Sequence, residues 1–169
     1  SDGGVNTEVM RIDGSTSRIG IGTTTPSSLL DIRGPAGSGT ATAGVLTLST
    51  AELTVINSDQ LGRIDFQAPL ESGGSDAILV AASIWAEADG TFTSTVNKTD
   101  LVFATGASSA AYEKLRLTDD GKLGLGTGEN IDAPLHVKYT GVDDGIILES
   151  TENGTSDAPD LVLYRNPLD

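Results

Sequence analysis

The side chain best suited to general acid or base catalysis is the only histidine of the sequence, His136. It lies between Leu135 and Val137, where alternation predicts a strand, and we expect its imidazole on the polar, solvated side. Catalysis of the Ser-His-Asp type needs that imidazole held between a hydroxyl and a carboxylate. No G-x-S-x-G segment, a common setting for such a serine, accompanies it. We therefore predict no catalytic residue and no enzymatic activity.

Two kinds of segment resemble ligand-binding loops. Calcium needs an ordered set of about six to eight oxygen ligands, and neither Asp-Asp-Gly segment, 119–121 or 143–145, has the spacing of an EF-hand. A phosphate-binding glycine loop lies between a strand and a helix, whereas the Gly-x-Gly-Thr segments at 20–23 and 124–127 precede loops that contain proline. We interpret all four as turns or strands and predict no metal and no cofactor. Paired carboxylates of a glycosidase stay open, because they can meet in three dimensions only.

Aromatic side chains could offer flat surfaces to sugars. Trp85 and Tyr139 are the candidates for a contact with glycan. Packing within a thin β-structure is the commoner role of an isolated aromatic residue, so glycan contact is the alternative interpretation of these two.

Composition limits the partners and the kind of core. The 169 residues carry a formal net charge of −14, which argues against nucleic acid as a partner, because phosphate binding needs clustered Lys and Arg. There is no cysteine, so no disulfide framework is expected. No apolar run approaches the roughly 18 residues of a membrane-spanning helix, so we expect no membrane insertion. Hydrophobic residues make up 37% and aromatic residues 4%, while glycine occurs 21 times. Such a chain has few large side chains for a thick core of its own, which predicts a thin core shared between chains.

The elements expected to position these residues are strands. Apolar and polar residues alternate in 10–13, 64–66 and 115–118, which is the period of a β-strand with one buried face. Asp-Gly pairs at 13–14, 89–90 and 120–121 favour turns between such strands. We expect a strand at 78–88 that pairs with 101–104, and a turn or two of helix at 107–114. The predicted fold class is all-β, with short antiparallel strands and hairpins.

The sequence also repeats itself. Residues 9–32 align with 114–137, and 44–50 align with 145–151, in the same order and about a hundred residues apart. Arg11 matches Arg116, and the two Gly-x-Gly-Thr segments match each other. Repetition of this kind is typical of proteins that build length. We predict the end of one module at 1–34, a complete module at 35–141 and a truncated next module at 142–169, within a longer polypeptide.

Four blocks of the sequence resemble, in order, segments of the tail fibre proteins of tailed bacteriophages. They are MRIDGSTSRIGIGTTTPSSLLDI at 10–32, LGRIDF at 61–66, IWAEADGTFT at 84–93 and LVFAT at 101–105. The resemblance implies a homotrimeric fibre on the virion that serves host attachment and adjoins other tail or baseplate proteins. Family members often end in a self-cleaving chaperone domain, which no segment here matches. The sequence departs from the family pattern in its first turn. Where the family has Ser-x-Gly, this chain has Gly-Ser-Thr-Ser at 14–17, which is one residue longer than Asp-Asp-Gly at 119–121.

We therefore expect an intertwined trimeric fibre shaft, with a structural role outside the cell. Its three-fold core is expected to contain alternating apolar residues of both repeat copies: Ile12, Ile19, Ile21, Leu115, Leu117, Leu123 and Leu125. An adhesin module that touches host glycan or protein is the first alternative. A tailspike depolymerase is less favoured because the period is near a hundred residues rather than the shorter rungs of a solenoid. A capsid-decorating fibre is a variant of the main interpretation.

Overall fold

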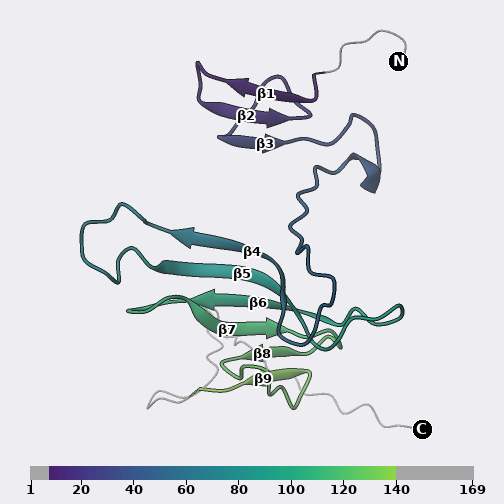
Figure 1. Ribbon diagram of the computed structural model, residues 1–169, viewed down its shortest axis with the longest axis vertical. Helices are drawn as coiled ribbons and strands as arrows, with labels where there is room; N and C mark the ends of the chain where they lie inside the picture. The colour runs from purple at the N-terminus through teal and green to yellow at the C-terminus, as the bar shows by residue number, and fades with distance from the viewer. Residues whose placement is uncertain (1–7, 140–169) are drawn as a thin grey trace, which may run out of the picture. The chain divides into compact units, whose positions relative to one another are not determined.

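The computed structural model of the chain describes residues 8–139 and divides into two compact units, Ser1–Ala51 and Glu52–Asp169. Strands dominate both units, and the only helix in the described part is a single 3-10 turn, Thr40–Thr42 (Figure 1). No helix within residues 8–139 is long and apolar enough to cross a membrane. The all-β prediction is confirmed.

The first unit contains a three-stranded sheet in the order β1 (Met10–Asp13), β2 (Arg18–Ile21) and β3 (Leu30–Ile32). β1 and β2 are antiparallel, and the Asp13 carboxylate closes their turn by accepting hydrogen bonds from the Ser15 amide at 2.9 Å and the Thr16 hydroxyl at 2.8 Å. These hydrogen bonds, Ser15 first, lower the pKa of Asp13 to about 2. The Asp-Gly turn predicted here is therefore fixed by its aspartate.

The second unit contains a six-stranded sheet whose strands follow one another in chain order (Figure 1). They are β4 (Gln60–Gln67), β5 (Val80–Ala88), β6 (Thr99–Thr105), β7 (Tyr112–Leu117), β8 (Leu123–Leu125) and β9 (Leu135–Val137). The expected strand at 78–88 is thus present, and it pairs with 99–105 as antiparallel neighbours.

Two sequence-based expectations about these elements were wrong. The helical turn expected at 107–114 is absent, because Tyr112 begins β7 and pairs with Thr105. Pairing with a neighbouring strand outweighs the weak helix preference of an alanine-rich segment. The strands are also not all antiparallel, since β2–β3 and β8–β9 are parallel pairs. In both cases a proline-containing crossover, rather than a hairpin, connects the two strands.

The last three strands of the second unit have the same pairing as the three strands of the first. Arg11 lies opposite Gly20 and Gly20 opposite Asp31, while Arg116 lies opposite Gly124 and Gly124 opposite His136. The hydrogen bonds at the ends of the strands agree too, since Gly22 donates to Val9 and Gly126 donates to Lys114, each at 2.8 Å. Both glycines have a φ of 72°.

This agreement covers the segments 9–33 and 114–138. The second repeated block compares 44–50 with 145–151, and the latter lies outside the described residues. The hundred-residue module, with boundaries at 34 and 141, stays a prediction.

Candidate functional site

One face of the six-stranded sheet is apolar across its whole width. Residues paired across neighbouring strands point to the same side of a sheet, so the register defines which side chains share this face. Two rows make it up, and together we call them the apolar face: Ile64, Ile84, Phe103, Leu115, Leu125 and Val137 in the first row, and Ala86, Leu101, Leu117, Leu123 and Leu135 in the second.

The single chain leaves this face open to water. Ile64 is 44% exposed, Leu125 44% and Leu135 59%, while Phe103 at 37% is only slightly more covered. A buried core side chain of this size is shielded almost completely. The apolar face therefore has the composition of a core and the exposure of a surface.

The small sheet of the first unit repeats this pattern. Met10, Ile12 and Leu30 are 53%, 71% and 52% exposed, and the register places them on one side with Ile19 and Ile21. The residues expected in a trimer core thus fall into two exposed apolar faces, one in each unit. Ile12, Ile19 and Ile21 belong to the first, and Leu115, Leu117, Leu123 and Leu125 to the second. Their burial in a trimer stays a prediction.

The opposite face of the six-stranded sheet is the one that the chain covers by itself. Arg116 on β7 is the centre of this face, and its side chain is only 4% exposed. Its Nη1 donates to Asp100 on β6 and its Nη2 to Glu87 on β5, both at 2.8 Å. The Nε and Nη2 atoms also donate to Glu113, at 3.0 and 2.6 Å. One guanidinium therefore joins three carboxylates from three adjacent strands.

The electrostatic consequence is a tightly held cation. Burial alone lowers the pKa of the Arg116 guanidinium, but the hydrogen bonds that it donates to Glu113, Asp100 and Glu87 outweigh burial and raise the pKa above its ordinary value. Within the described residues every buried side-chain nitrogen and oxygen has a hydrogen-bond partner. A buried charge is tolerated only when it is paired and hydrogen-bonded in this way.

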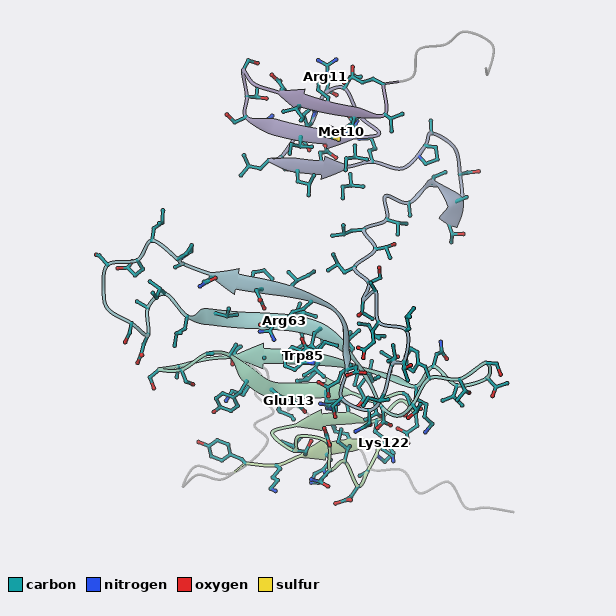
Figure 2. All side chains as sticks on the ribbon, in the orientation of Figure 1. Met10, Arg11, Arg63, Trp85, Glu113 and Lys122 are labelled. Atoms are coloured by element: carbon teal, nitrogen blue, oxygen red, sulfur yellow. The ribbon has the colours of Figure 1, made fainter. Side chains whose placement is uncertain are left out.

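Trp85 extends this covered face along β5 (Figure 2). It is 8% exposed, and its indole nitrogen donates to Glu87 at 2.8 Å. The guanidinium carbon of Arg63 lies 5.3 Å from the ring centroid, a cation–π distance. Val102 and Ala104 pack beside the ring and are 0% and 2% exposed. In the single chain the ring therefore offers little surface to a sugar.

This cluster of charges was not predicted from the sequence. Glu87 and Asp100 lie on other strands than Arg116, so nothing local in the sequence brings them together. One signal was present: a glutamate precedes the arginine by three residues in both repeat copies, at 8 and 11 and at 113 and 116. In both copies that glutamate binds the arginine through two hydrogen bonds.

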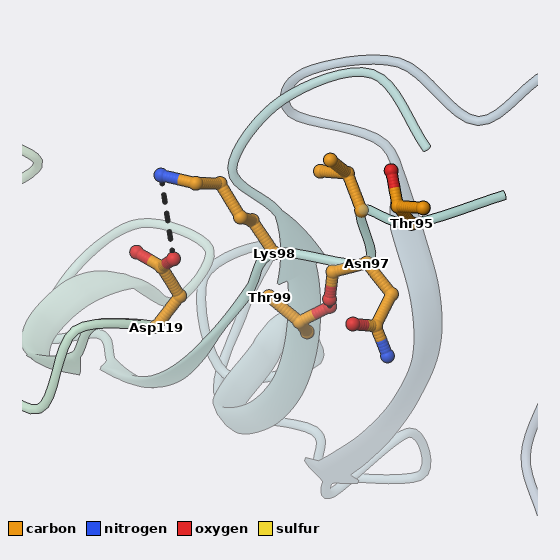
Figure 3. A pocket seen from close by; sticks show the side chains of 6 residues that line it. Thr95, Asn97, Lys98, Thr99 and Asp119 are labelled. Atoms are coloured by element: carbon orange, nitrogen blue, oxygen red, sulfur yellow. Dashed lines mark hydrogen bonds and ion pairs between the residues drawn. The ribbon is translucent and has the colours of Figure 1, made fainter. Parts of the chain in front are cut away.

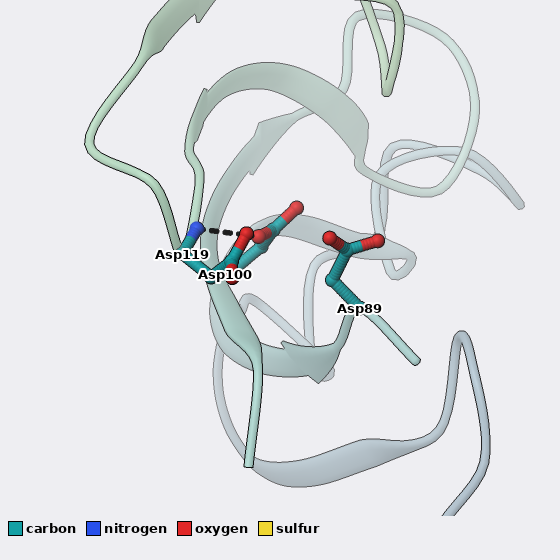
Figure 4. Close-up of side chains that lie close together, drawn as sticks. All are labelled: Asp89, Asp100 and Asp119. Atoms are coloured by element: carbon teal, nitrogen blue, oxygen red, sulfur yellow. Dashed lines mark hydrogen bonds between the residues drawn. The ribbon is translucent and has the colours of Figure 1, made fainter. Parts of the chain in front are cut away.

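Three carboxylates lie within 4.8 Å of one another at one end of the sheet: Asp89, Asp100 and Asp119 (Figure 4). Asp100, which is buried, and Asp119, which is exposed, are already engaged by other groups. Asp100 accepts from Arg116 and from the Asp119 amide, and Asp119 pairs with Lys98 at 3.4 Å. These contacts join the β7–β8 turn to β6, which accounts for the cluster without a metal ion.

Beside Asp119 lies a shallow hollow of about 340 Å³, lined by Thr95, Asn97, Lys98 and Thr99 (Figure 3). Apart from Val96, the side chains there are polar; residues 95–98 belong to the long β5–β6 connection, and Thr99 begins β6. The Lys98–Asp119 ion pair described above lies at its wall.

A second hollow, of about 500 Å³, lies between β7 and the end of β9. Tyr112 and Tyr139 line it together with Lys114 and Lys138. The Lys114 ammonium lies 3.2 Å from the centroid of the Tyr112 ring, and Tyr139 is 64% exposed. Of the two aromatic residues predicted to contact glycan, Tyr139 is thus the one with free surface.

The remaining sequence candidates have structural positions. His136 is on β9, half-buried, and its Nδ1 accepts from the Asp132 amide at 3.3 Å. In the Gly-x-Gly-Thr segment, a Cβ on Gly124 would meet the side chains of Thr127 and Ile131, so the glycine permits close packing over β8. The Asp-Asp-Gly segment at 143–145 lies outside the described residues.

Comparison with known proteins adds no relative. No protein-family model matches the chain, and no curated protein matches it. The similarity to tail fibre proteins therefore remains an expectation from the sequence blocks alone.

Proposed function

We propose that this chain is a shaft segment of a homotrimeric fibre, and that the fibre is a tail fibre of a virion that supports host attachment. The observation that carries the proposal is the apolar face of the six-stranded sheet, which the single chain leaves exposed. The role is structural and not catalytic, and the site of action is outside the cell, on the virion.

The physical argument begins with which face the chain covers. The side with Arg116 and Trp85 is closed by contacts within one chain, so it needs no partner. The apolar face has no such cover. Full burial of a large apolar side chain contributes about 1.5–3 kcal/mol, and the partly exposed side chains of this face gain only part of it in the single chain. Association with other copies supplies the missing cover. A three-fold arrangement gives every copy the same environment and closes the sheets around a common axis.

The charge of the chain is consistent with this arrangement. With a formal net charge of −14, copies repel one another unless a specific apolar contact holds them together. Association through the apolar face alone leaves the acidic loops on the outside. The result is a soluble rod whose copies join in one way.

The test is the association state of the full chain. We expect sedimentation equilibrium and native mass spectrometry to give three copies at micromolar concentration. Leu125→Asp places a charge on the apolar face and should abolish association, since an unpaired buried charge is very costly. Leu53→Asp is the matched control, because Leu53 is 100% exposed and lies outside the sheet. A stable monomer of the unmodified chain, or a dimer that packs the two faces together, would overturn the trimer.

The virion role has its own test. Antibodies raised against this chain should label the distal appendages of intact virions in electron micrographs, and peptides of the chain should be found in purified particles. Labelling confined to the capsid would replace the tail fibre with a capsid decoration.

A second candidate function is a glycan-binding adhesin module of the same fibre, which the hollow with Tyr112 and Tyr139 favours. Exposed tyrosines beside lysines suit the stacking and hydrogen bonding of a sugar. If the chain is a shaft, Tyr139→Ala leaves virion adsorption unchanged. If it is an adhesin, the purified chain competes with virions for host cells and Tyr139→Ala removes that competition.

A further inference from the structure

The two arginines at equivalent positions of the repeat differ sharply in their surroundings. Arg116 is 4% exposed, whereas Arg11 is 41% exposed. Both have the same fork to a glutamate three residues earlier, since Nε and Nη2 of Arg11 donate to Glu8 at 2.7 Å. What Arg116 has in addition is Asp100 and Glu87, which come from β6 and β5.

The difference follows from the strands that are present. β7 is an inner strand, with β6 on one side and β8 on the other. β1 occupies the equivalent position in the first unit, yet it is an edge strand, and none of the described residues pairs with its outer side. Otherwise the two sets of three strands share their register, their glycine conformation and their terminal hydrogen bonds.

The free edge of β1 also presents unpaired backbone groups. Gly22 donates to Val9, so odd-numbered residues of β1 face β2, and the amides of Met10 and Ile12 face outward. The equivalent amides of β7, at Leu115 and Leu117, face β6. An apolar edge strand with free amides is a template for a further strand.

We propose that the outer edge of β1 binds a two-stranded β-hairpin of the same chemistry as β5–β6, which extends the sheet of the first unit from three strands to five. The incoming strand carries a small apolar residue opposite Arg11, as Val102 lies opposite Arg116. The hairpin carries one carboxylate on each strand, at the positions of Asp100 and Glu87, and both bind the part of the Arg11 guanidinium that Glu8 leaves open. Apolar residues at the positions of Leu101 and Phe103 continue the exposed face of Ile12 and Met10.

Charge complementarity selects this partner. An arginine that already binds one glutamate can donate hydrogen bonds to further carboxylates in a fixed fork geometry. The second unit shows that geometry within the same molecule. A hairpin without acidic residues at those two positions binds poorly, because pairing with the edge would bury an arginine whose only carboxylate partner is Glu8. The site thus distinguishes hairpins of the β5–β6 type from other strands. This inference does not depend on the proposed trimer.

The test joins a second copy of residues 52–112 directly to Glu8, so that Tyr112 precedes Glu8 as it precedes Glu113 in the second unit. Hydrogen exchange then reports on the amides of Met10 and Ile12. We expect exchange at these two amides to slow about tenfold or more, because they pass from an open edge into a ladder. The matched control carries Glu87→Gln and Asp100→Asn in the added copy only, and it should lose most of that protection. Unchanged exchange at Met10 and Ile12 would overturn the proposal.

A second measurement covers the case in which the joined chain folds poorly. A labelled peptide of residues 78–106 is added to the full chain, and binding is followed by fluorescence anisotropy. Binding should be lost in Arg11→Met and kept in Arg116→Met. The reverse pattern would mean that the peptide exchanges with the strands of the second unit, and no binding to either protein would mean that the edge of β1 does not accept a hairpin; both results refute the proposal. Sedimentation of the same samples measures the number of copies, so the proposed trimer is tested separately from the binding of a hairpin to β1.

Discussion

Replacing Arg116 by methionine tests the interpretation of the covered face. The change keeps the length of the side chain but removes the only cation among Glu87, Asp100 and Glu113, which are left with like charges in a shielded place. Removing one partner of a buried ion pair costs about 3–5 kcal/mol. Because three carboxylates lose their shared cation here, we expect a value at the upper end of that range.

Trp85 is the only tryptophan of the chain and binds Glu87, so its fluorescence reports unfolding of this sheet directly. In urea, with a slope of about 2 kcal/mol per M, the midpoint should fall by roughly 2 M. Chain concentration must be the same in all samples, because association adds to apparent stability. Arg116→Lys should give an intermediate loss, since an ammonium keeps the charge but not the fork.

Lys122→Met is the matched control in the same unit. Lys122 pairs with Asp120 at 2.9 Å, and both side chains are exposed. An exposed pair of this kind contributes about 0–1 kcal/mol, so the midpoint should barely move. Equal losses for Arg116→Met and Lys122→Met would refute the idea that the charge cluster holds the covered face together.

Two further predictions concern the turns and crossovers. Gly126→Ala should destabilise the second unit at least about twice as much as Gly121→Ala, for which positive φ alone costs about 1–2 kcal/mol. Both residues have positive φ, but only at Gly126 would a Cβ run into the backbone carbonyl of Lys138 and displace β9, so thermal unfolding of the two variants measures the clash. The carboxyl of Asp13 should titrate near pH 2 by NMR, because Ser15 and Thr16 lower its pKa to about 2 from 3.8. Because the pKa of Asp13 is lower in the folded state, its ionised carboxylate stabilises the fold above about pH 3.8, and this contribution is lost as the pH falls through about 2. Asp13→Asn should remove this pH dependence of stability. A titration of Asp13 near 3.8 would contradict the prediction.

Local patterns were enough to predict the strands and several of their connections. The weakly polar run at 78–88, with a partner segment at 101–104 beyond an Asp-Gly pair, predicted β5, which spans Val80–Ala88, and its pairing with β6; Asp-Gly also marked the turns at 13–14 and 120–121. The alignment of Arg11 with Arg116 also anticipated which strand triplets share a register. These features depend on neighbouring residues, which a sequence displays directly.

What alternation does not reveal is which of the two faces a chain covers by itself. The polar side of β5, β6 and β7 is covered here, because Arg116 draws together Glu87 and Asp100 from strands 29 and 16 residues away. The parallel pairing of β8 with β9 was missed for a related reason. It depends on how a crossover packs against Gly124 and Gly126, which no local period encodes.

The open apolar face has a consequence for biosynthesis. If the proposed trimer forms, a newly made chain exposes Phe103, Leu125 and their neighbours to water before it meets other copies. Specific association then competes with nonspecific aggregation, and the ratio of the two depends on how fast and how abundantly the chain is translated. The intramolecular salt bridges become useful at this stage, since each copy meets its partners with its strand register already fixed. Slow synthesis at low temperature should therefore raise the yield of correctly assembled protein.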